Sequence, residues 1–323
     1  MPRPDPAADY RPIVVPARGD GMRLDRFLAG FFVDRSRSWL AKGIRDGRVT
    51  DAHARTLKGS HRVREGDELR LFLEEIAPSE APPPLPPVLH EDDRYIAIEK
   101  PAGMLAHPAG STFVWALITL AKAKWPDERI DLAHRLDRDT SGVIFLTRDL
   151  EANRFLKGAL QRGDCRKEYL ALCRGHADWT ERSLRGPIGY RGGEIRIQMA
   201  VRDDGLAAHT DVEVLGRGER LTRVRCRLHT GRTHQIRVHL AHAGLPILGD
   251  RLYGVPEHVF LDTLEHGVTE ATVEATGAPR QALHAWRTTV PHPDGGEVTV
   301  EATEPPDMRR WWASDLSDAP PGR

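Results

Sequence analysis

Cysteine is scarce in this chain, and none of the cysteines forms a CxxC pair. There are three of them, Cys165, Cys173 and Cys226. An odd number without close spacing argues against a disulfide framework and against a cysteine-based zinc site. A reducing compartment is the simplest interpretation, so we expect a cytoplasmic protein.

Long apolar runs are also lacking. No stretch approaches the ~20 apolar residues that a membrane-spanning helix needs. The N-terminal sequence MPRPDPAADYRP has no apolar stretch after its charges, unlike a secretory signal. Hydrophobic residues still make up 40% of the chain, which is enough for a packed core. We therefore expect no membrane partner, and disordered tails at residues 1–20 and 313–323.

An excess of one charge is missing as well, because 47 Lys and Arg balance 47 Asp and Glu. The cations are nevertheless concentrated locally. Residues 22–64 hold 11 Lys/Arg and 4 Asp/Glu, an excess of 7, and residues 222–242 hold five arginines, four histidines and no acid. Two basic zones in a neutral chain are compatible with a polyanion partner, but solvated faces give the same pattern.

A proline-rich segment, APSEAPPPLPPVL (77–89), divides the chain. Proline cannot donate a backbone hydrogen bond, and runs of proline favour an extended, semi-rigid form. This segment is therefore predicted to be a linker. It separates a small module at residues 21–76 from a larger one at residues 90–312.

The small module is predicted to contain two helices and a small sheet. Apolar residues at helical spacing indicate a first helix in residues 22–32, and a second is expected in residues 36–47. Short strands should follow near residues 48–50 and 68–73. The second helix carries several cations on or beside it: Arg35, Arg37, Lys42 and Arg45.

The larger module mixes strands and helices without strict alternation. Strands are expected at residues 94–101, 143–148, 167–175, 196–200, 209–215, 222–228 and 297–301. Helices are expected at residues 114–124, 150–162 and 234–243. Because strands outnumber helices, we predict an α+β fold with a mixed, mostly antiparallel sheet flanked by helices and loops, rather than a doubly wound parallel sheet.

Two acids, two arginines and a histidine are concentrated in HRLDRDTSG (134–142), directly before an apolar strand. Loops seated on strands often carry reactive groups. Arg135 and Arg138 are chain neighbours of Asp137, and a nearby cation lowers the pKa of a carboxyl group. An ionised carboxylate can act as a nucleophile or a general base. Taken alone, the segment also fits a solvated charged turn.

A second group of polar residues lies in LHTGRTHQIRVHLAHAG (228–244), where Thr230 or Thr233 is expected to cap a helix. On that helix, Arg237 could reach a buried carboxylate. The segment holds four histidines, His229, His234, His239 and His242. Their spacings of five, five and three match no common zinc motif, so we predict no metal and leave a histidine-based metallohydrolase as the weakest alternative.

Tyr169 lies on a predicted strand in RKEYLALCRG (166–175), just after two cations, Arg166 and Lys167. A core aromatic is the ordinary interpretation, because strands are enriched in aromatic residues. The alternative is a ring that stacks on a nucleobase while its basic neighbours hold phosphates.

Together these segments resemble the RluA-type family of RNA pseudouridine synthases. HRLDRDTSG (134–142) matches the catalytic motif of the family nearly letter for letter. The further matches, in the order that the family has them, are EKPAGMLAHP (99–108), KEYLAL (167–172), HTGRTHQIRVHLAHAGLPILGDRLYG (229–254) and LHAWRTTVPHP (283–293). The resemblance covers about residues 91–293.

The small module resembles the RNA-binding domain of ribosomal protein S-four, in RLDRFLA (23–29), SRSWLAKGIRDGRV (36–49) and VREGDEL (63–69). One departure is VTDAH (49–53), which stands where that domain usually has V-x-V-N-G. The tight Asn-Gly hairpin of the domain is therefore not expected here.

The resemblance implies an isomerase that converts uridine to pseudouridine in structured RNA. Large-subunit ribosomal RNA is the expected substrate and transfer RNA the alternative. Asp137 would be the catalytic aspartate, Arg237 its ion-pair partner and Tyr169 a ring that stacks on a flipped-out uracil. Further RNA contacts are expected from His134, Arg135, Arg138, Thr140, Arg232, His234 and Gln235, and from the cations of the small module.

The family uses no cofactor and no metal, and we expect a monomer. A non-catalytic RNA-binding protein is the main alternative from another class. Such a protein has no need for a carboxylate paired with an arginine, and a pseudouridine assay on bulk RNA would separate the two hypotheses.

Overall fold

The computed structural model describes residues 11–31, 37–71, 82–108, 115–193, 195 and 197–317. The chain divides into two compact units. One combines Met1–Leu85 with His107–Lys124, and the other combines Pro86–Ala106 with Trp125–Arg323. None of the described helices is both long and apolar enough to cross a membrane.

The smaller unit contains a three-stranded antiparallel sheet in the order β1-β3-β2. Its helices α1 and α2 pack against each other, and apolar side chains from both helices join those of the sheet in one core. The elements are β1 (Arg11–Val14), α1 (Leu24–Phe31), α2 (Arg37–Arg45), β2 (Val49–Asp51), β3 (Glu68–Leu71) and, in the second segment of this unit, α3 (Leu117–Lys124). The two helices and the strands after them follow the prediction.

Both predicted tails are partly wrong. Residues 11–14 form β1, which pairs with β3, so the expectation of a disordered tail over residues 1–20 fails for its second half. Residues 313–317 belong to α8 (Pro306–Ser317). The buried carboxylate of Asp315 in this helix accepts the backbone N–H of Leu221 at 2.9 Å. Residues 1–10 and 318–323 lie outside the described part of the chain.

The turn that stands in place of the Asn-Gly hairpin of the related domain is held by a side chain. The Oδ1 atom of Asp51 accepts the backbone N–H groups of His53 and Arg55, both at 2.9 Å. Ala54 adopts a left-handed conformation with a φ of 60°. The side chain of Asp51 therefore stabilises this turn, which contains no glycine.

The larger unit is built around a ten-stranded sheet, in the order β4-β5-β7-β14-β8-β13-β12-β9, with β15 paired to β14 and β6 paired to β7. Its strands are β4 (Val88–Glu91), β5 (Tyr95–Lys100), β6 (Asp131–Leu132), β7 (Ser141–Thr147), β8 (Arg166–Arg174), β9 (Glu181–Leu184), β12 (Thr210–Arg217), β13 (Leu221–Leu228), β14 (Leu283–Pro291) and β15 (Glu297–Glu301). The pairing of β7 with β14 is parallel, and the other pairings of this sheet are antiparallel. The predicted α+β fold with a mixed, mostly antiparallel sheet is confirmed.

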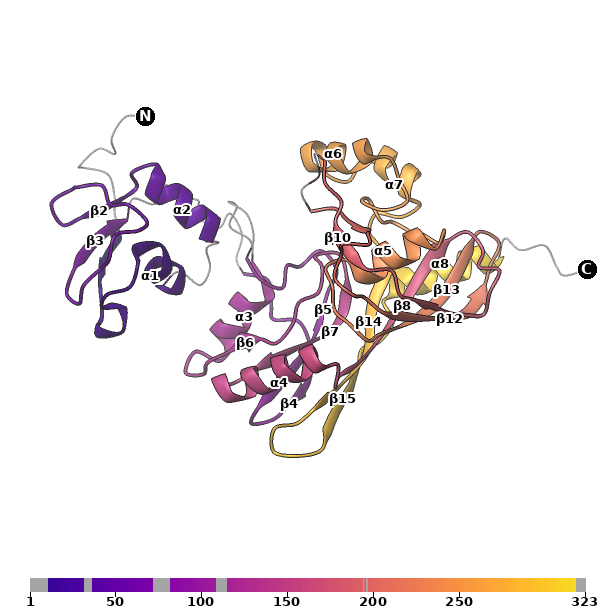
Figure 1. The fold of residues 1–323 in the computed structure, drawn as a ribbon, viewed down its shortest axis with the longest axis horizontal. Helices are drawn as coiled ribbons and strands as arrows, with labels where there is room; N and C mark the ends of the chain where they lie inside the picture. The colour runs from indigo at the N-terminus through magenta and orange to yellow at the C-terminus, as the bar shows by residue number, and fades with distance from the viewer. Residues whose placement is uncertain are drawn as a thin grey trace, which may run out of the picture. The chain divides into compact units, whose positions relative to one another are not determined.

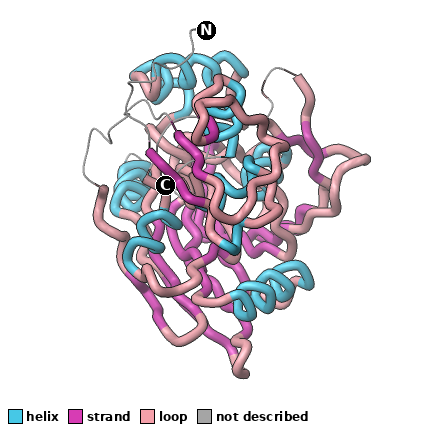
Figure 2. Tube along the Cα trace, turned by 90° about the vertical axis from the view of Figure 1, so that its left-hand side faces the viewer, coloured by secondary structure: helices cyan, strands magenta, loops and turns pink. Residues whose placement is uncertain are grey.

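Helices flank this sheet, as Figures 1 and 2 show. They are α4 (Leu150–Arg162), α5 (Gln235–His242), α6 (Glu257–His266), α7 (Glu270–Thr276) and α8, and a separate pair of strands, β10 (Ile188–Tyr190) and β11 (Met199–Val201), lies beside α5. Asp149 caps the N-terminus of α4, where its side chain accepts the N–H of Ala152, and Gly163 caps the C-terminus in a left-handed conformation. Its apolar face packs on β7 through Leu156 and Phe145.

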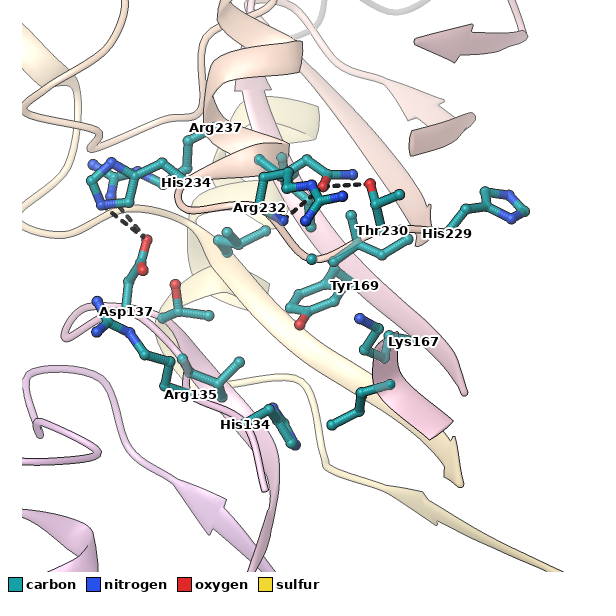
Figure 3. A pocket seen from close by; sticks show the side chains of 18 of the residues that line it. His134, Arg135, Asp137, Lys167, Tyr169, His229, Thr230, Arg232, His234 and Arg237 are labelled. Carbon is teal, nitrogen blue, oxygen red and sulfur yellow. Dashed lines mark hydrogen bonds and ion pairs between the residues drawn. The ribbon is translucent and has the colours of Figure 1, made fainter. Parts of the chain in front are cut away.

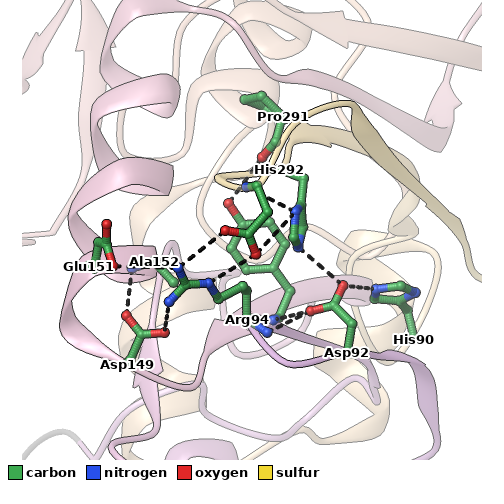
Figure 4. A network of polar contacts seen from close by, with 10 residues as sticks. His90, Asp92, Arg94, Asp149, Glu151, Ala152, Pro291 and His292 are labelled. Atoms are coloured by element: carbon green, nitrogen blue, oxygen red, sulfur yellow. Dashed lines mark hydrogen bonds and ion pairs between the residues drawn. The ribbon is translucent and has the colours of Figure 1, made fainter.

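A polar network fixes the corner where β5, α4 and the β14–β15 connection meet (Figure 4). Arg94 donates from Nε to Asp294 and from Nη1 to Asp149, both at 3.1 Å. The hydroxyl of Tyr95 donates to the carbonyl of Pro291 at 3.0 Å. Because Asp149 also caps α4, this network is structural.

The parallel contact of β7 with β14 determines where the HRLDRDTSG loop sits. Ser141 and Gly142 pair with His284 and Ala285. Gly142 has a φ of 111°, and a Cβ there would stand 2.1 Å from the carbonyl oxygen of Ala285. Only glycine fits at this position, and the loop therefore enters β7 directly beside β14.

Candidate active site

A pocket of about 450 Å³ opens in the larger unit, where the loop before β7, the strand β8 and the loop before α5 meet. Asp137, Tyr169 and Arg237 all line it (Figure 3). These three residues lie in three different sequence segments, and the structure brings them to one cavity.

Asp137 is paired with Arg237, as the resemblance implies. The distance from Nη1 of Arg237 to Oδ2 of Asp137 is 2.9 Å. Burial alone would raise the pKa of Asp137, but the charge and hydrogen bond of Arg237 outweigh that effect and hold the pKa below its ordinary value. Asp137 is therefore an ionised carboxylate with a fixed direction at the wall of the pocket.

Arg237 has a second carboxylate partner that the sequence did not reveal. Asp250 accepts from Nε at 2.7 Å and from Nη2 at 2.9 Å. Arg237 is 8% exposed and Asp250 1%. The Oδ1 atom of Asp250 also accepts the backbone N–H of Leu252 at 2.9 Å, so the carboxylate is itself held by the chain. Asp250 lies inside the long C-terminal signature, but nothing local distinguishes it from a surface acid.

His234 stands between Asp137 and Tyr253. Its Nε2 atom is 3.9 Å from Oδ2 of Asp137, and its Nδ1 atom is 2.8 Å from the hydroxyl of Tyr253. That hydroxyl already accepts the backbone N–H of Met199 at 3.0 Å, so its own proton is free to point at Nδ1. We assign the imidazole proton to Nε2, which faces Asp137. Burial and then the charge of Arg237 lower the pKa of His234 to about 4, so the ring is neutral.

Tyr169 is buried on β8, and its ring lies at the centre of the view in Figure 3. Within the described part of the chain its hydroxyl makes no hydrogen bond. Burial raises the pKa of Tyr169, and the negative charge of Asp137 raises it further. Tyr169 is thus a neutral phenol.

Lys167 is a pocket residue that was not singled out from the sequence. It lies two positions before Tyr169, on the same face of β8, and is 9% exposed. Among the described residues it has no ion pair or hydrogen bond, and burial lowers its pKa. The neighbouring cation, Arg166, is exposed instead and pairs with Glu297 at 2.6 Å. Of the two cations before Tyr169, Lys167 is the one that lines the pocket.

His134 also lines the pocket, but it is not a cation. Its Nε2 atom accepts the backbone N–H of Phe145 at 3.1 Å. Burial, with a smaller effect from Lys167, lowers the pKa of His134 to about 3. The ring is therefore neutral and is tied to β7.

Gln235, an expected RNA contact, lines the pocket, but its side chain is engaged inside the protein. It is 3% exposed, and its amide is fully engaged inside the protein. Its Oε1 accepts from the hydroxyl of Thr230 at 2.7 Å and from the N–H of Arg232 at 3.0 Å, while its Nε2 donates to the carbonyl of His209 at 2.9 Å. Gln235 is thus a structural residue. The expected cap by Thr230 or Thr233 is also wrong, because His234 precedes α5 in a left-handed conformation without a side-chain cap.

Two further predicted contacts, Arg138 and Thr140, have structural partners. Arg138 lies outside the pocket lining and donates from Nε to the carbonyl of Gly103 at 3.1 Å. Thr140 is buried and accepts from the amide of Gln281 at 2.6 Å. Two predicted cations do lie exposed at the pocket: Arg135 and Arg232.

The predicted contacts of the small unit lie on or beside α2. Arg35 falls outside the described residues, and the side chain of Arg37 is not described. Lys42 pairs with Asp46 at 2.6 Å, one turn further along, and Arg45 is exposed.

Lys100 links the early motif to the loop that carries Asp137. Its fully buried ammonium donates to three carbonyls, those of Pro101 and Met104 at 2.8 Å and that of Arg138 at 3.0 Å. Burial lowers the pKa of Lys100 to about 7, although the charges of Asp139 and Asp137 partly offset this effect. The EKPAG segment therefore holds the residue directly after Asp137 in place.

Comparison with known proteins shows which family the chain belongs to. Residues 94–242 match the family described as RNA pseudouridylate synthase. "Ribosomal large subunit pseudouridine synthase D" of Xanthomonas campestris pv. campestris is 38% identical over 97% of this chain and 94% of its own. The protein of the same name in Pseudomonas aeruginosa is 37% identical over 87% of this chain and 88% of its own. In fold, the chain is similar to human RNA pseudouridylate synthase domain containing 1, with a TM-score of 0.56 and 21% identity over 76% of this chain and 100% of that one.

This chain therefore belongs to the family of RNA pseudouridine synthases, isomerases that convert uridine to pseudouridine in RNA. Within that family it is of the RluA type, which the sequence motifs predicted.

Proposed function

We propose that this chain isomerises specific uridines of large-subunit ribosomal RNA, with Asp137 as the catalytic carboxylate on a flipped-out uridine. The observation that carries the proposal is the ion pair of the half-buried Asp137 with the buried Arg237, at the wall of a pocket that also contains Tyr169. The choice of RNA rests on the relatives, which are named as synthases of the large ribosomal subunit.

The reaction needs a carboxylate and a closed surface for a detached base. The bond from C1′ of the ribose to N1 of uracil breaks, the base rotates, and a bond from C1′ to C5 forms, while a proton leaves C5 and N1 gains one. No atom is gained or lost, so no co-substrate is required. An ionised Asp137 serves as the nucleophile at C1′ or as the base of a glycal route. The uridine must leave its stack, because the glycosidic bond is shielded there.

The roles of the neighbouring residues follow from their charge and burial. Arg237 keeps Asp137 ionised and aimed. Tyr169 offers the flipped uracil an aromatic face, and as a neutral phenol it can donate a proton but not accept one at neutral pH. Lys167 lies in the wall of the pocket, and its ammonium group is proposed to bind an RNA phosphate.

The small unit is proposed to add RNA affinity as an S-four-like domain. Its helix α2 carries the exposed cation Arg45 and the ion-paired Lys42. Phosphate contacts of this kind position an RNA without reading its sequence. We further propose that the chain acts as a monomer.

The proposal is tested by mapping pseudouridine in total RNA from cells that lack the gene and carry either the wild-type chain or Asp137→Asn. The wild type should restore one or more sites in large-subunit ribosomal RNA, whereas Asp137→Asn should restore none while it still binds RNA. Asp178→Asn, a change at an exposed acid outside the pocket, is the matched control. Sites restored by Asp137→Asn would refute the catalytic role. Sites restored only in transfer RNA would refute the substrate and leave the chemistry intact.

A further inference from the structure

Beside the pocket, two histidines and an aspartate from adjacent strands converge. The pairing of β12 with β13 starts at Thr210 and Leu228, and one position outside it the N–H of His229 donates to the carbonyl of His209 at 3.1 Å. The two rings stack with centroids 4.0 Å apart and an angle of 10° between their planes. Asp211 follows His209 by two residues and therefore lies on the same face of the sheet.

Both rings point their Nε2 atom at the same carboxylate. The Nε2 atom of His209 is 2.9 Å from Oδ1 of Asp211, and that of His229 is 2.7 Å from Oδ2. Ser183, which lies opposite Asp211 on β9, has its hydroxyl 2.8 Å from Oδ1. The positions of these side chains are set by the register of three strands, so the cluster is built on rigid backbone.

We propose that His209, Asp211 and His229 form a binding site for a divalent transition-metal ion such as Zn²⁺ or Co²⁺. Neutral imidazoles and a carboxylate are the ligands that such ions take in proteins. One ligand atom from each side chain can be chosen so that all three lie within 4.8 Å of one another. Three protein ligands leave at least one coordination position open.

The spacing fits an ion after small movements. Two ligand atoms at ~2.1 Å from a tetrahedral ion lie ~3.4 Å apart. The present separations, 2.7 Å from His229 Nε2 to Oδ2 of Asp211 and 2.9 Å from His209 Nε2 to Oδ1, must therefore open by about 0.7 and 0.5 Å. His229 is exposed and His209 and Asp211 are half-buried, so rotations about their side-chain bonds are the movement that the proposal invokes.

The neighbouring arginines do not pair with Asp211. Its neighbours on β13, Arg225 and Arg227, are paired with Glu213 and Glu168 instead. The hydroxyl of Ser183 donates to Oδ1 of Asp211 at 2.8 Å and also lies 2.9 Å from Nε2 of His209, so it can orient the carboxylate as an outer-shell partner once that imidazole binds the ion. Asp211 and the two histidines thus form a site with its own orienting residue.

Sequence spacing could not reveal this site. Of the four histidines in residues 228–244, the structure brings only His229 to it. His234 bonds to Tyr253, and His239 bonds to the carbonyl of Gly186 at 2.8 Å. The partner of His229 comes from the neighbouring strand, 20 positions earlier in the chain.

The test uses the untagged full-length protein, stripped with a chelator and titrated with cobalt chloride alone. Visible absorption of bound Co²⁺ and calorimetry with zinc chloride should both show one saturable site. His209→Ala and His229→Ala should each weaken binding by more than ~100-fold, and Ser183→Ala by roughly 10-fold, the range that outer-shell partners of metal ligands show. Circular dichroism and a melting curve establish that each variant is folded, and His209→Gln serves as a second variant of similar size.

Two controls separate this proposal from the catalytic one. His176→Ala removes an exposed histidine elsewhere and should leave cobalt binding unchanged. Asp137→Asn should bind cobalt as the wild type does, because the site does not depend on isomerase activity. No saturable binding up to millimolar metal, or binding that survives both histidine changes, would overturn the proposal.

Discussion

Asp250 and Arg237 form a bidentate ion pair, with Nε to Oδ2 at 2.7 Å and Nη2 to Oδ1 at 2.9 Å. This pair uses two of the three guanidinium nitrogens and leaves Nη1 for Asp137. A guanidinium is planar, so fixing one edge sets the direction of the other. Asp250 does not line the pocket, but through Arg237 it sets the orientation of the Asp137 carboxylate, which does line it.

Asp250→Asn should strongly reduce kcat, although Asp250 does not line the pocket that is proposed to bind the RNA. A misplacement of ~1 Å at a reacting group can cost ~10²-fold in rate, and we expect a loss of kcat of this order. Breaking a buried ion pair also destabilises a fold by about 3–5 kcal/mol. The measurements are kcat and RNA affinity from single-turnover kinetics, and the free energy of unfolding from denaturant titration.

Asp307→Asn is the matched control for Asp250→Asn. Asp307 accepts from Nε and Nη2 of Arg280, both at 2.7 Å, but its partner does not reach Asp137. This variant should lose stability and keep its kcat. If Asp250→Asn also kept its kcat, the orienting role assigned to Asp250 would be wrong.

Tyr169→Phe should retain most of the activity. The hydroxyl has no hydrogen-bond partner among the described residues, and the ring that faces the pocket is kept. Tyr169→Ala, in contrast, should weaken binding of the flipped base, because base–aromatic stacking is worth ~1–3 kcal/mol. Separate measurement of KM and kcat distinguishes the two effects. A complete loss of kcat in Tyr169→Phe would assign the hydroxyl a proton-transfer role instead.

Local signals explain which elements the sequence predicted well. The helix at residues 150–162 was predicted with its observed bounds, because Asp149 caps its start and Gly163 ends it. The strand β9 (Glu181–Leu184) was missed, because ERSL has no apolar alternation and forms a strand only through its pairing with β12. The tail prediction failed at residues 11–14 for the same reason, since that strand depends on β3.

Some residues of the candidate site could likewise be predicted from the sequence, and others could not. The motifs supplied Asp137 and Arg237, whose contact spans 100 positions of the chain. Asp250 was missed because nothing in its local sequence marks a carboxylate as buried. Lys167 could have been found, since it precedes Tyr169 by two positions on one strand and therefore shares its face. Gln235 was assigned to RNA because a polar residue in a motif looks available, whereas its partners are visible only in the fold.

The pH profile of kcat should have no acid limb, that is, kcat should not decrease as the pH is lowered from 8 to 5. The pKa of Asp137 lies below its ordinary value, and that of His234 is about 4, so neither group titrates in this range. In Arg237→Met the burial of Asp137 is no longer opposed, so its pKa should rise and an acid limb should appear. A wild-type limb with a midpoint near 6 would contradict the ion pair.

The same ion pair predicts the sign of a stability change. A carboxyl group whose pKa is lower in the folded state stabilises the fold above its unfolded pKa of about 3.9, and this stabilisation is lost as the pH falls through the folded pKa. The unfolding free energy of the wild type minus that of Asp137→Asn should therefore be constant from pH 5 to 8 and should decrease below about pH 4. Denaturant titrations at a series of pH values measure it.

Lys167→Met should reduce the salt dependence of RNA binding. An ammonium that binds one phosphate contributes ~0.7 to ~0.9 to the slope of log affinity against log salt concentration. Binding is measured by fluorescence anisotropy in an Asp137→Asn background, where no turnover occurs. Arg166→Met is the neighbouring control, and it should change the slope less, because Arg166 is exposed and paired with Glu297. An unchanged slope in Lys167→Met would show that its ammonium holds no phosphate, and the pocket would then bind the nucleotide through its base and ribose alone.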